Sequence, residues 1–322
     1  VGHNLTIVTH NEEISHAINT QGLRVTTPEG ELTVPATAHT HLEAVEGPFD
    51  VALLAMKATG VEEAARNVAG YLSPDGYVVT LQNGVVEDRV GQILGRDRVV
   101  GALVGWGATM HAPGVYEMTS RGELNVGELD GAVTSRVQEL KRILDAAART
   151  NVSANIYGVL WSKLAINCVV TTLGAVTGQL LGEMLRRGAV RHLALVITSE
   201  VVDVAQAYGI ALEPVGGTLD VHRLYLPPER RGRGFGLDLL PKHVILLVVG
   251  LKFRRLKSSM LQSLERGRQP EIEFMNGYVV ERGREKDVPT PVNAALTEMV
   301  REIESGDREI QPENLDELML VI

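Results

Sequence analysis

The fold is decided by two apolar stretches that follow one another in the chain, Phe49-Asp-Val-Ala-Leu-Leu-Ala-Met56 and Tyr77-Val-Val-Thr-Leu81. Short, nearly continuous apolar runs are typical of strands in a parallel sheet that is covered on both faces. The residues between them, from Val61 to Tyr71, have the pattern of a helix. Because strands that alternate with helices build parallel sheets, we predict an α/β fold for this part of the chain.

Polar residues directly follow both predicted strands. Lys57 comes after the first strand, and Gln82-Asn83-Gly84 follows the second. In open parallel sheets, ligands bind outside the carboxyl ends of the strands, so Lys57 and Asn83 are candidate binding residues. Two alternatives stay open at this point: Asn-Gly is a common turn dipeptide, and a lysine is an ordinary way to end a strand at the surface.

The predicted sheet extends on both sides of these strands. We expect a strand over residues 1–10, a short helix over 11–20, a hairpin around Pro28-Glu-Gly30, an amphipathic helix over 134–149 and a last strand over 151–156. From Tyr157 onward the pattern becomes helical. We therefore predict two domains, residues 1–156 with the sheet and residues 157–322 with helices.

The helical part contains a polar stripe in Trp161-Ser-Lys163-Leu-Ala-Ile-Asn167-Cys-Val-Val-Thr171. Lys163, Asn167 and Thr171 are four residues apart, so on a helix they share one face. That face offers an ammonium, an amide and a hydroxyl within an apolar run, which indicates a functional site. The alternative is a helix edge where the lysine reaches water and the asparagine bonds to a neighbouring segment.

Two proline-containing segments predict further helix starts. Pro270 suits a first helical turn, and Glu271 just inside it is favoured by the helix dipole. Such a carboxylate is expected to stay ionised unless it is buried. Thr290 before Pro291 is expected to cap the helix that runs to Glu304.

The composition narrows the class of protein. The chain has 322 residues, 44% of them hydrophobic, and a formal net charge of −9. This is an ordinary globular composition with length for two domains and a sizeable core. The negative charge argues against a general nucleic-acid-binding protein, which needs clustered positive charge. The single cysteine, Cys168, excludes an internal disulfide and disfavours a thiolate metal cluster, so we expect no metal site and a reducing, cytoplasmic setting.

The longest mostly apolar run lies within residues 159–182. Lys163, Asn167 and several threonines interrupt it, so we expect a buried core helix there and no membrane span. The start of the chain shows no basic segment followed by an apolar one, so no signal peptide is visible.

Residues 216–257 depart from these patterns. An Arg-, Gly- and Pro-rich loop, Pro227–Gly236, precedes an apolar helix with a basic end, Pro241–Leu256. We favour an inserted hairpin or an oligomer contact. A lid over an anionic ligand is an alternative, and nucleic-acid binding by the Arg-Gly run is the least favoured one.

Six motifs occur in an order that resembles the ketopantoate reductase (2-dehydropantoate 2-reductase) family, within the wider group of 6-phosphogluconate-dehydrogenase-like enzymes. They span almost the whole chain, and the ordered set is specific although no single motif is. The resemblance implies a Rossmann domain, a helical second domain and NADPH-dependent reduction of a 2-oxo acid. The motifs are Ala55-Met-Lys57-Ala, Leu81-Gln-Asn83-Gly84, Trp161-Ser-Lys163-Leu-Ala-Ile-Asn167, Ser258-Ser259-Met-Leu-Gln, Glu271-Ile-Glu-Phe-Met-Asn276-Gly277 and Pro289-Thr-Pro291-Val-Asn293.

The resemblance also implies roles for individual residues. Lys163 resembles the family's general acid, which protonates the carbonyl oxygen as hydride arrives from the nicotinamide. Glu271 resembles the carboxylate that binds the substrate hydroxyl and orients the lysine. Substrate contacts are implied for Asn167, Ser259 and Thr171, the last of which stands where the family usually has a second asparagine. Cofactor contacts are implied for Lys57, Asn83, Gly84, His10 and Asn11.

Several departures from the family pattern stand beside the resemblance. The family begins with a strand and a G-x-G-x-x-G turn that cradles the pyrophosphate at a helix N-terminus. This chain begins at the strand after it, so we expect roughly 20 or more further residues in front, because a strand, turn and helix need about 30. A chain without them is not expected to bind a dinucleotide in the usual way. His10-Asn11 stands in place of the arginine that commonly meets the 2′-phosphate, which keeps NAD open beside NADP. Ser263 and Pro270 replace the usual Asp and Thr, and the segment at 216–257 is longer than typical.

We therefore predict NADPH-dependent reduction of 2-dehydropantoate to pantoate, in pantothenate and coenzyme A biosynthesis. The expected protein is a cytoplasmic homodimer that binds a small 2-oxo acid and neither nucleic acid nor membrane. One alternative is a related reductase of another 2-oxo acid or ketone, which Thr171 and the insertion support. A second alternative is a non-catalytic dinucleotide-binding protein on the same fold, against which the presence of both Lys163 and Glu271 counts.

Overall fold

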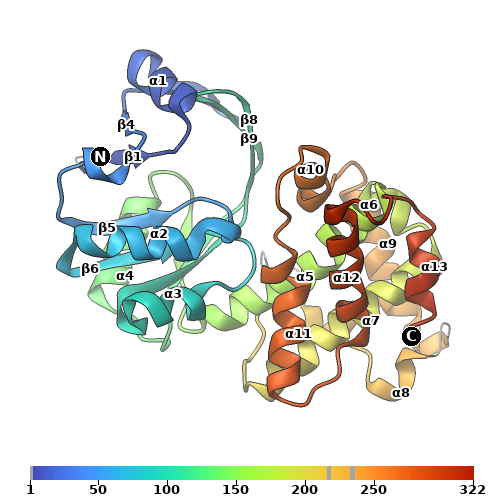
Figure 1. Cartoon of the computed structure of the whole chain (residues 1–322). Helices are drawn as coiled ribbons and strands as arrows, with labels where there is room; N and C mark the ends of the chain where they lie inside the picture. The colour runs from blue at the N-terminus through green and yellow to red at the C-terminus, as the bar shows by residue number, and fades with distance from the viewer. Residues whose placement is uncertain (1–2, 216–218, 233–235) are drawn as a thin grey trace. The chain divides into compact units, whose positions relative to one another are not determined.

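The computed structural model describes residues 3–215, 219–232 and 236–322, and these form two compact units (Figure 1). The first unit holds a Rossmann-like sheet, and the second, which takes over after Ile156, is helical. The predicted fold class is confirmed. Two short segments that follow strands of the sheet, Lys57–Thr59 and Asn83–Val86, pack with the second unit.

The main sheet of the first unit has five strands in the order β11-β10-β7-β6-β5. β5, β6 and β7 are parallel, whereas β10 is antiparallel to β7 and parallel to β11. The sheet is therefore mixed, where the sequence predicted a parallel one. The strands are β5 (Phe49–Leu54), β6 (Leu72–Thr80), β7 (Val99–Val104), β10 (Leu124–Glu128) and β11 (Thr150–Val152).

The prediction that the apolar run at Phe49–Met56 is covered on both faces is wrong for the described residues. β5 ends one edge of the sheet, and 40% of Leu53 is exposed. The reason lies in the pairing of the N-terminal strand. β1 (Thr6–Val8) does not continue the sheet but pairs in parallel with β4 (Thr37–His39) as a separate two-stranded sheet.

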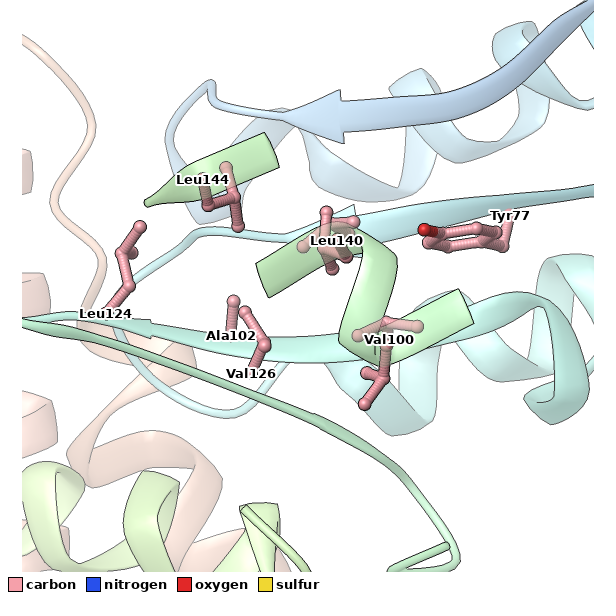
Figure 2. Packing of buried hydrophobic residues seen from close by; sticks show 9 residues of the cluster. Tyr77, Val100, Ala102, Leu124, Val126, Leu140 and Leu144 are labelled. Carbon is pink, nitrogen blue, oxygen red and sulfur yellow. The ribbon is translucent and has the colours of Figure 1, made fainter. Parts of the chain in front are cut away.

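One face of the main sheet is covered by α4 (Ser135–Leu144), as Figure 2 shows. Its buried residues Val137, Leu140 and Leu144 recur at helical spacing and pack against apolar side chains of β6, β7 and β10. The hydroxyl of Thr134 accepts the Val137 N–H and caps the helix. α4 is shorter than the predicted 134–149, because the Asp145 carboxylate accepts the backbone N–H of Thr150 (2.8 Å) and holds the turn into β11.

The N-terminal predictions agree with the structure in outline. α1 (Glu12–Gln21) begins after Asn11, whose Oδ1 accepts the Ile14 N–H at 2.9 Å. The predicted hairpin is formed by β2 (Leu23–Thr27) and β3 (Gly30–Val34), which are antiparallel. It joins β9 (Val115–Ser120) and β8 (Gly107–Ala112) in a four-stranded sheet of order β3-β2-β9-β8. α2 (Val61–Val68) and α3 (Glu87–Leu94) complete the first unit.

The second unit is built around α5 (Ile156–Thr177) and α7 (Gly188–Ala207). By length and composition α5 could span a membrane, but 78% of its most apolar window is buried, as in a core helix. The other helices of this unit are α6 (Leu181–Met184), α8 (Pro228–Arg231), α9 (Leu240–Lys252), α10 (Ser259–Glu265), α11 (Asn276–Glu285), α12 (Pro291–Ser305) and α13 (Asn314–Met319).

The segment predicted as an insertion, 216–257, is only partly a loop. Residues 216–218 and 233–235, which include part of the Arg-Gly run, lie outside the described residues. Pro228 begins α8, so the predicted loop at Pro227–Gly236 contains a helical turn. The guanidinium of Arg231, at the end of that turn, forms an ion pair with Asp203 of α7.

Candidate active site

Lys163 lies in the middle of α5 and is half-buried. Burial lowers the pKa of its ammonium to about 8, while the nearby Glu271 carboxylate acts in the opposite direction and raises the pKa. The burial effect is the larger of the two. The result is a lysine that holds its proton at neutral pH and releases it far more readily than a solvated one, which is the property of a general acid.

Glu271 lies just before a short 3-10 helix, Ile272–Phe274, and α11 begins only at Asn276. The prediction that Glu271 lies inside the first turn of a helix is therefore wrong. Its Oε1 instead accepts the backbone N–H of Ala58 at 2.9 Å. Ala58 belongs to the segment that follows β5, so the carboxylate anchors the chain where this strand ends.

Lys57 directly precedes Ala58 and is largely exposed. Its Nζ donates to the hydroxyl of Ser263 at 2.5 Å, and that hydroxyl donates in turn to the carbonyl of Ser259 at 3.0 Å. The family departure at position 263 thus has a structural consequence, because a neutral hydroxyl rather than a carboxylate meets the lysine. Lys57 keeps an exposed positive charge beside α10.

The position after Asn83 requires a glycine. Its φ is +89°, and a Cβ there would lie 2.2 Å from the carbonyl oxygen of Phe274. The segment Asn83–Val86 therefore packs backbone to backbone against the 3-10 helix next to Glu271. The chain bends at Asn83 and Gly84 shortly after β6 ends, as expected from their place at a strand end, and the Asn83 side chain is half-buried.

Gln82 is a residue of this region whose role the sequence did not reveal. Its Nε2 donates to the carbonyl oxygens of Leu54 (2.8 Å) and Met56 (3.1 Å). A single buried amide thus joins the carboxyl ends of β5 and β6. The signal that could have found it is a glutamine placed where two adjacent strands both end.

The other residues of the α5 stripe differ in what they offer. The Asn167 side chain is half-buried, and its amide has no hydrogen-bond partner among the described residues. Thr171 is only 7% exposed, and its hydroxyl donates to the Asn167 carbonyl at 2.7 Å and lies 3.2 Å from the Met275 sulfur. The amide is therefore available to a ligand, whereas the hydroxyl is already engaged within the helix.

Ser258 and Ser259 have separate roles at the start of α10. Ser258 is the helix cap: its Oγ accepts the Leu261 N–H at 3.0 Å and donates to the Thr171 carbonyl at 2.5 Å. Ser259 lies in the first turn with its side chain exposed. The buried serine thus fixes α10 to α5, and its neighbour presents a free surface.

His10 and Asn11 belong to the first unit. Asn11 uses its side chain to cap α1, and His10 is exposed with its ring 6.5 Å from that of His41. Both follow β1, which places them after the carboxyl end of a strand that is parallel to its neighbour β4, as the family resemblance implied. They therefore belong to a different unit from Lys163 and Glu271.

A buried polar network lies behind the stripe and was not predicted. The Asn276 side chain accepts a hydrogen bond from the Thr172 hydroxyl (2.6 Å) and donates one to the Asn293 side chain (2.9 Å). Glu200 of α7 accepts the backbone N–H groups of Val292 and Asn293 at 3.0 and 2.9 Å. Glu200 therefore caps α12, and the prediction that Thr290 does so is wrong, because Thr290 forms no side-chain cap.

Burial also raises the pKa of Glu200 above its ordinary value. The signal for this residue was in the sequence: a lone glutamate interrupts the apolar run of α7. A charge at such a place needs buried partners.

A Rossmann-like sheet, a helical unit and a half-buried lysine near a carboxylate fit a nicotinamide-dependent oxidoreductase. Comparison with known sequences gives the family. Residues 1–131 match the model of ketopantoate reductase PanE/ApbA, and residues 155–304 match the model of its C-terminal domain. The chain belongs to the ketopantoate reductase family.

Curated relatives and solved structures agree with this assignment. The chain is 29% identical to the 2-dehydropantoate 2-reductase of Mesorhizobium japonicum, over 89% of this chain and 86% of that protein. It is 26% identical to the enzyme of the same name from Pyrococcus horikoshii, over 95% and 91%. A PanE/ApbA family ketopantoate reductase from Ralstonia eutropha JMP134 has a TM-score of 0.79 at 29% identity, covering 96% of this chain and 93% of that one.

Proposed function

We propose that this protein catalyses the NADPH-dependent reduction of 2-dehydropantoate to pantoate, a step of pantothenate and coenzyme A biosynthesis, in the cytoplasm. The observation that carries the proposal is Lys163, a half-buried lysine whose ammonium has a pKa of about 8 near Glu271. Relatives named for this reaction, at 23–29% identity and over most of both chains, support the substrate.

Lys163 would supply the proton of the reaction. Reduction of a ketone adds hydride to the carbonyl carbon, which the nicotinamide provides, and leaves negative charge on the oxygen. An ammonium aimed at that oxygen neutralises the charge as it forms and then transfers a proton to it. With a pKa of about 8, about 90% of the lysine is protonated at pH 7.

Glu271 would position both the substrate and the acid. One of its oxygens accepts the Ala58 N–H, which leaves the second oxygen able to accept a hydrogen bond from a substrate hydroxyl. Its negative charge also favours the protonated form of Lys163. The half-buried amide of Asn167 and the exposed hydroxyl of Ser259 offer further polar contacts for a small acid.

The donors that follow the strands fit the polar groups of a dinucleotide. Lys57 offers an exposed ammonium and Asn83 a half-buried amide, which suit phosphate and ribose oxygens. Gly84 permits the close turn between them and the 3-10 helix. His10 and Asn11 follow β1, where a dinucleotide's ribose is read in Rossmann sheets. NADPH is our choice, and NADH is the alternative because no arginine stands at this position.

A second candidate, reduction of a different 2-oxo acid or ketone, is favoured by one observation. The Thr171 hydroxyl already donates its hydrogen bond to the Asn167 carbonyl, so this position has no donor left for a substrate. A site that lacks one polar contact discriminates less against substrates that lack the matching group.

The deciding experiment measures NADPH and NADH oxidation by the full-length protein with 2-dehydropantoate and a panel of other 2-oxo acids. Preference for 2-dehydropantoate with NADPH supports the proposal. Activity on another acid alone replaces it with the second candidate. Cofactor binding without turnover on any substrate makes the protein a non-catalytic dinucleotide-binding protein and rejects both.

A further inference from the structure

The outer face of α9 is a continuous apolar stripe. Leu240, Val244, Leu247 and Leu251 follow one another at intervals of four, three and four residues, and Val248 lies beside them. Between 36% and 58% of each of these five residues is exposed. Intervals of four and three are the spacing of side chains that interlock with a second helix.

The opposite face of the same helix is already buried. His243, Leu246 and Gly250 face inward, and α9 packs on α6 and α7. Gly250 permits this close approach, since a Cβ there would lie 2.8 Å from the Leu185 side chain. α9 is therefore apolar on two sides, while a surface helix of a globular protein carries charge on its outer side. Such a helix is expected to be buried all round.

The stripe is part of a larger patch. Among the described residues, eight of the eighteen exposed large apolar side chains lie between Leu237 and Leu256, and Leu237 itself is 92% exposed. Together they expose roughly 700 Å², against the about 800 Å² that each partner buries in a standard protein interface. A contiguous apolar patch of this size marks an interaction site.

We propose that the α9 face, defined as the stripe with Leu237, Phe253 and Leu256, is the contact through which two copies of this chain form a homodimer. A closed pair requires the same patch on both copies, and a single self-complementary helix supplies it. Pairing the α9 helices across a two-fold axis covers both stripes at once.

The charges around the stripe set the direction of the pair. Lys252, Arg254 and Arg255 gather at the C-terminal end of α9, whereas its N-terminal end has Lys242 and Asp238, and Asp238 is paired with Arg230 at 3.0 Å. Parallel helices would bring two basic ends together, which is unfavourable. Antiparallel helices keep the two basic ends apart, so we infer an antiparallel arrangement.

A membrane surface is the other partner that an apolar helix with a basic end could bind. Two observations favour the second copy. The chain has a net charge of −9, which an anionic lipid surface repels. α9 also has no charged long face to remain in water, because its second side is packed on α6 and α7.

The test measures the mass of the full-length protein in solution by light scattering over a wide range of concentration. The expected mass is twice the 34.9 kDa of one chain. Val248→Glu places a charge within the stripe and should weaken dimerisation by at least about thirtyfold, as the loss of an interface hot spot does. Val133→Glu is the matched control, since Val133 is 57% exposed in the first unit and should leave the dimer intact.

Disulfide trapping tests the direction, because Cys168 is the only native cysteine and is buried. In an antiparallel pair centred on the stripe, Val244→Cys brings the two thiols together and yields a covalent dimer. Leu251→Cys places them about 16 Å apart along the axis, beyond the roughly 7 Å that a disulfide can span between Cα atoms. Equal trapping by both variants rejects the antiparallel pair.

Three results overturn the proposal. A monomer at every concentration removes the dimer. A dimer that Val248→Glu does not weaken uses another surface. A monomer that sediments with phosphatidylserine vesicles, and no longer does so as Val248→Glu, assigns the face to a membrane. Unchanged circular dichroism of the variants shows that they fold.

Discussion

Replacing Glu271 by glutamine should move the alkaline limit of activity to lower pH. Glutamine keeps the oxygen that accepts the Ala58 N–H, so the local fold is preserved, but it removes the negative charge that raises the pKa of Lys163. In the proposed mechanism, reduction needs the proton on Lys163, so kcat/KM should fall as pH rises through the pKa of the free enzyme.

The size of the effect follows from the two opposing causes at Lys163. The pKa falls from 10.5 to about 8 in the native enzyme, which is a cost of about 3 kcal/mol to the charged form. An opposite charge close by is worth about 1 to 3 pKa units, so its loss should bring the pKa to between about 5 and 7. At pH 7 the protonated fraction then drops from about 90% to half or less.

The assay is the pH profile of kcat/KM with the 2-oxo acid that the substrate panel selects. Glu273→Gln is the matched control, because Glu273 lies in the 3-10 helix that directly follows Glu271 but pairs with Arg301, and its profile should keep the limb near pH 8. The reasoning is refuted if the limb of Glu271→Gln also stays near pH 8, since the carboxylate would then exert no influence on the acid.

Three further changes have distinct signatures. Lys163→Met should reduce kcat by several orders of magnitude while cofactor affinity stays nearly constant. It should also raise the free energy of unfolding at pH 7 by up to about 3 kcal/mol, because a lysine with a depressed pKa destabilises the folded protein below that pKa. Urea titrations should show that this gain becomes smaller as the pH rises from about 8 towards 10.5. Gly84→Ala should destabilise the protein by at least about 2 kcal/mol and raise the KM for cofactor, because its φ and its contact with Phe274 both exclude a Cβ. Glu200→Ala should lower the free energy of unfolding by about 3 kcal/mol with little change in KM, since it leaves buried N–H groups of α12 unpaired; equal unfolding midpoints would show that water replaces it.

The strand ends could be predicted from the sequence because the information there is local. β5 and β6 are short apolar runs, each followed at once by a polar residue, and parallel neighbours necessarily end on the same side. The spacing of Lys163, Asn167 and Thr171 likewise fixed their shared face of α5. The position of β5 at an edge could not be predicted, because an apolar strand reads the same whether or not a partner covers it.

Contacts between segments that are far apart in the sequence could not be predicted either, because local sequence patterns do not contain them. Thr290 has the residue type of a cap, yet Glu200, ninety residues earlier in the chain, occupies the N–H groups that Thr290 would have taken. Propensity is a weak prior where a buried charge competes for the same donors. The depressed pKa of Lys163 is of this kind as well, since it depends on what surrounds α5 rather than on α5 itself.

The segment after β5 contacts two residues that lie more than two hundred positions later in the chain. Lys57 donates to Ser263, while the next residue, Ala58, donates its backbone N–H to Glu271. A phosphate that drew the Lys57 ammonium away from Ser263 would therefore pull on a segment that is bonded to the carboxylate beside the acid. The proposed cofactor contact, Lys57, is thus adjacent in the chain to the residue that binds Glu271, the carboxylate near the proposed acid. These hydrogen bonds join the motif at residues 55–58 to segments more than two hundred residues later in the chain.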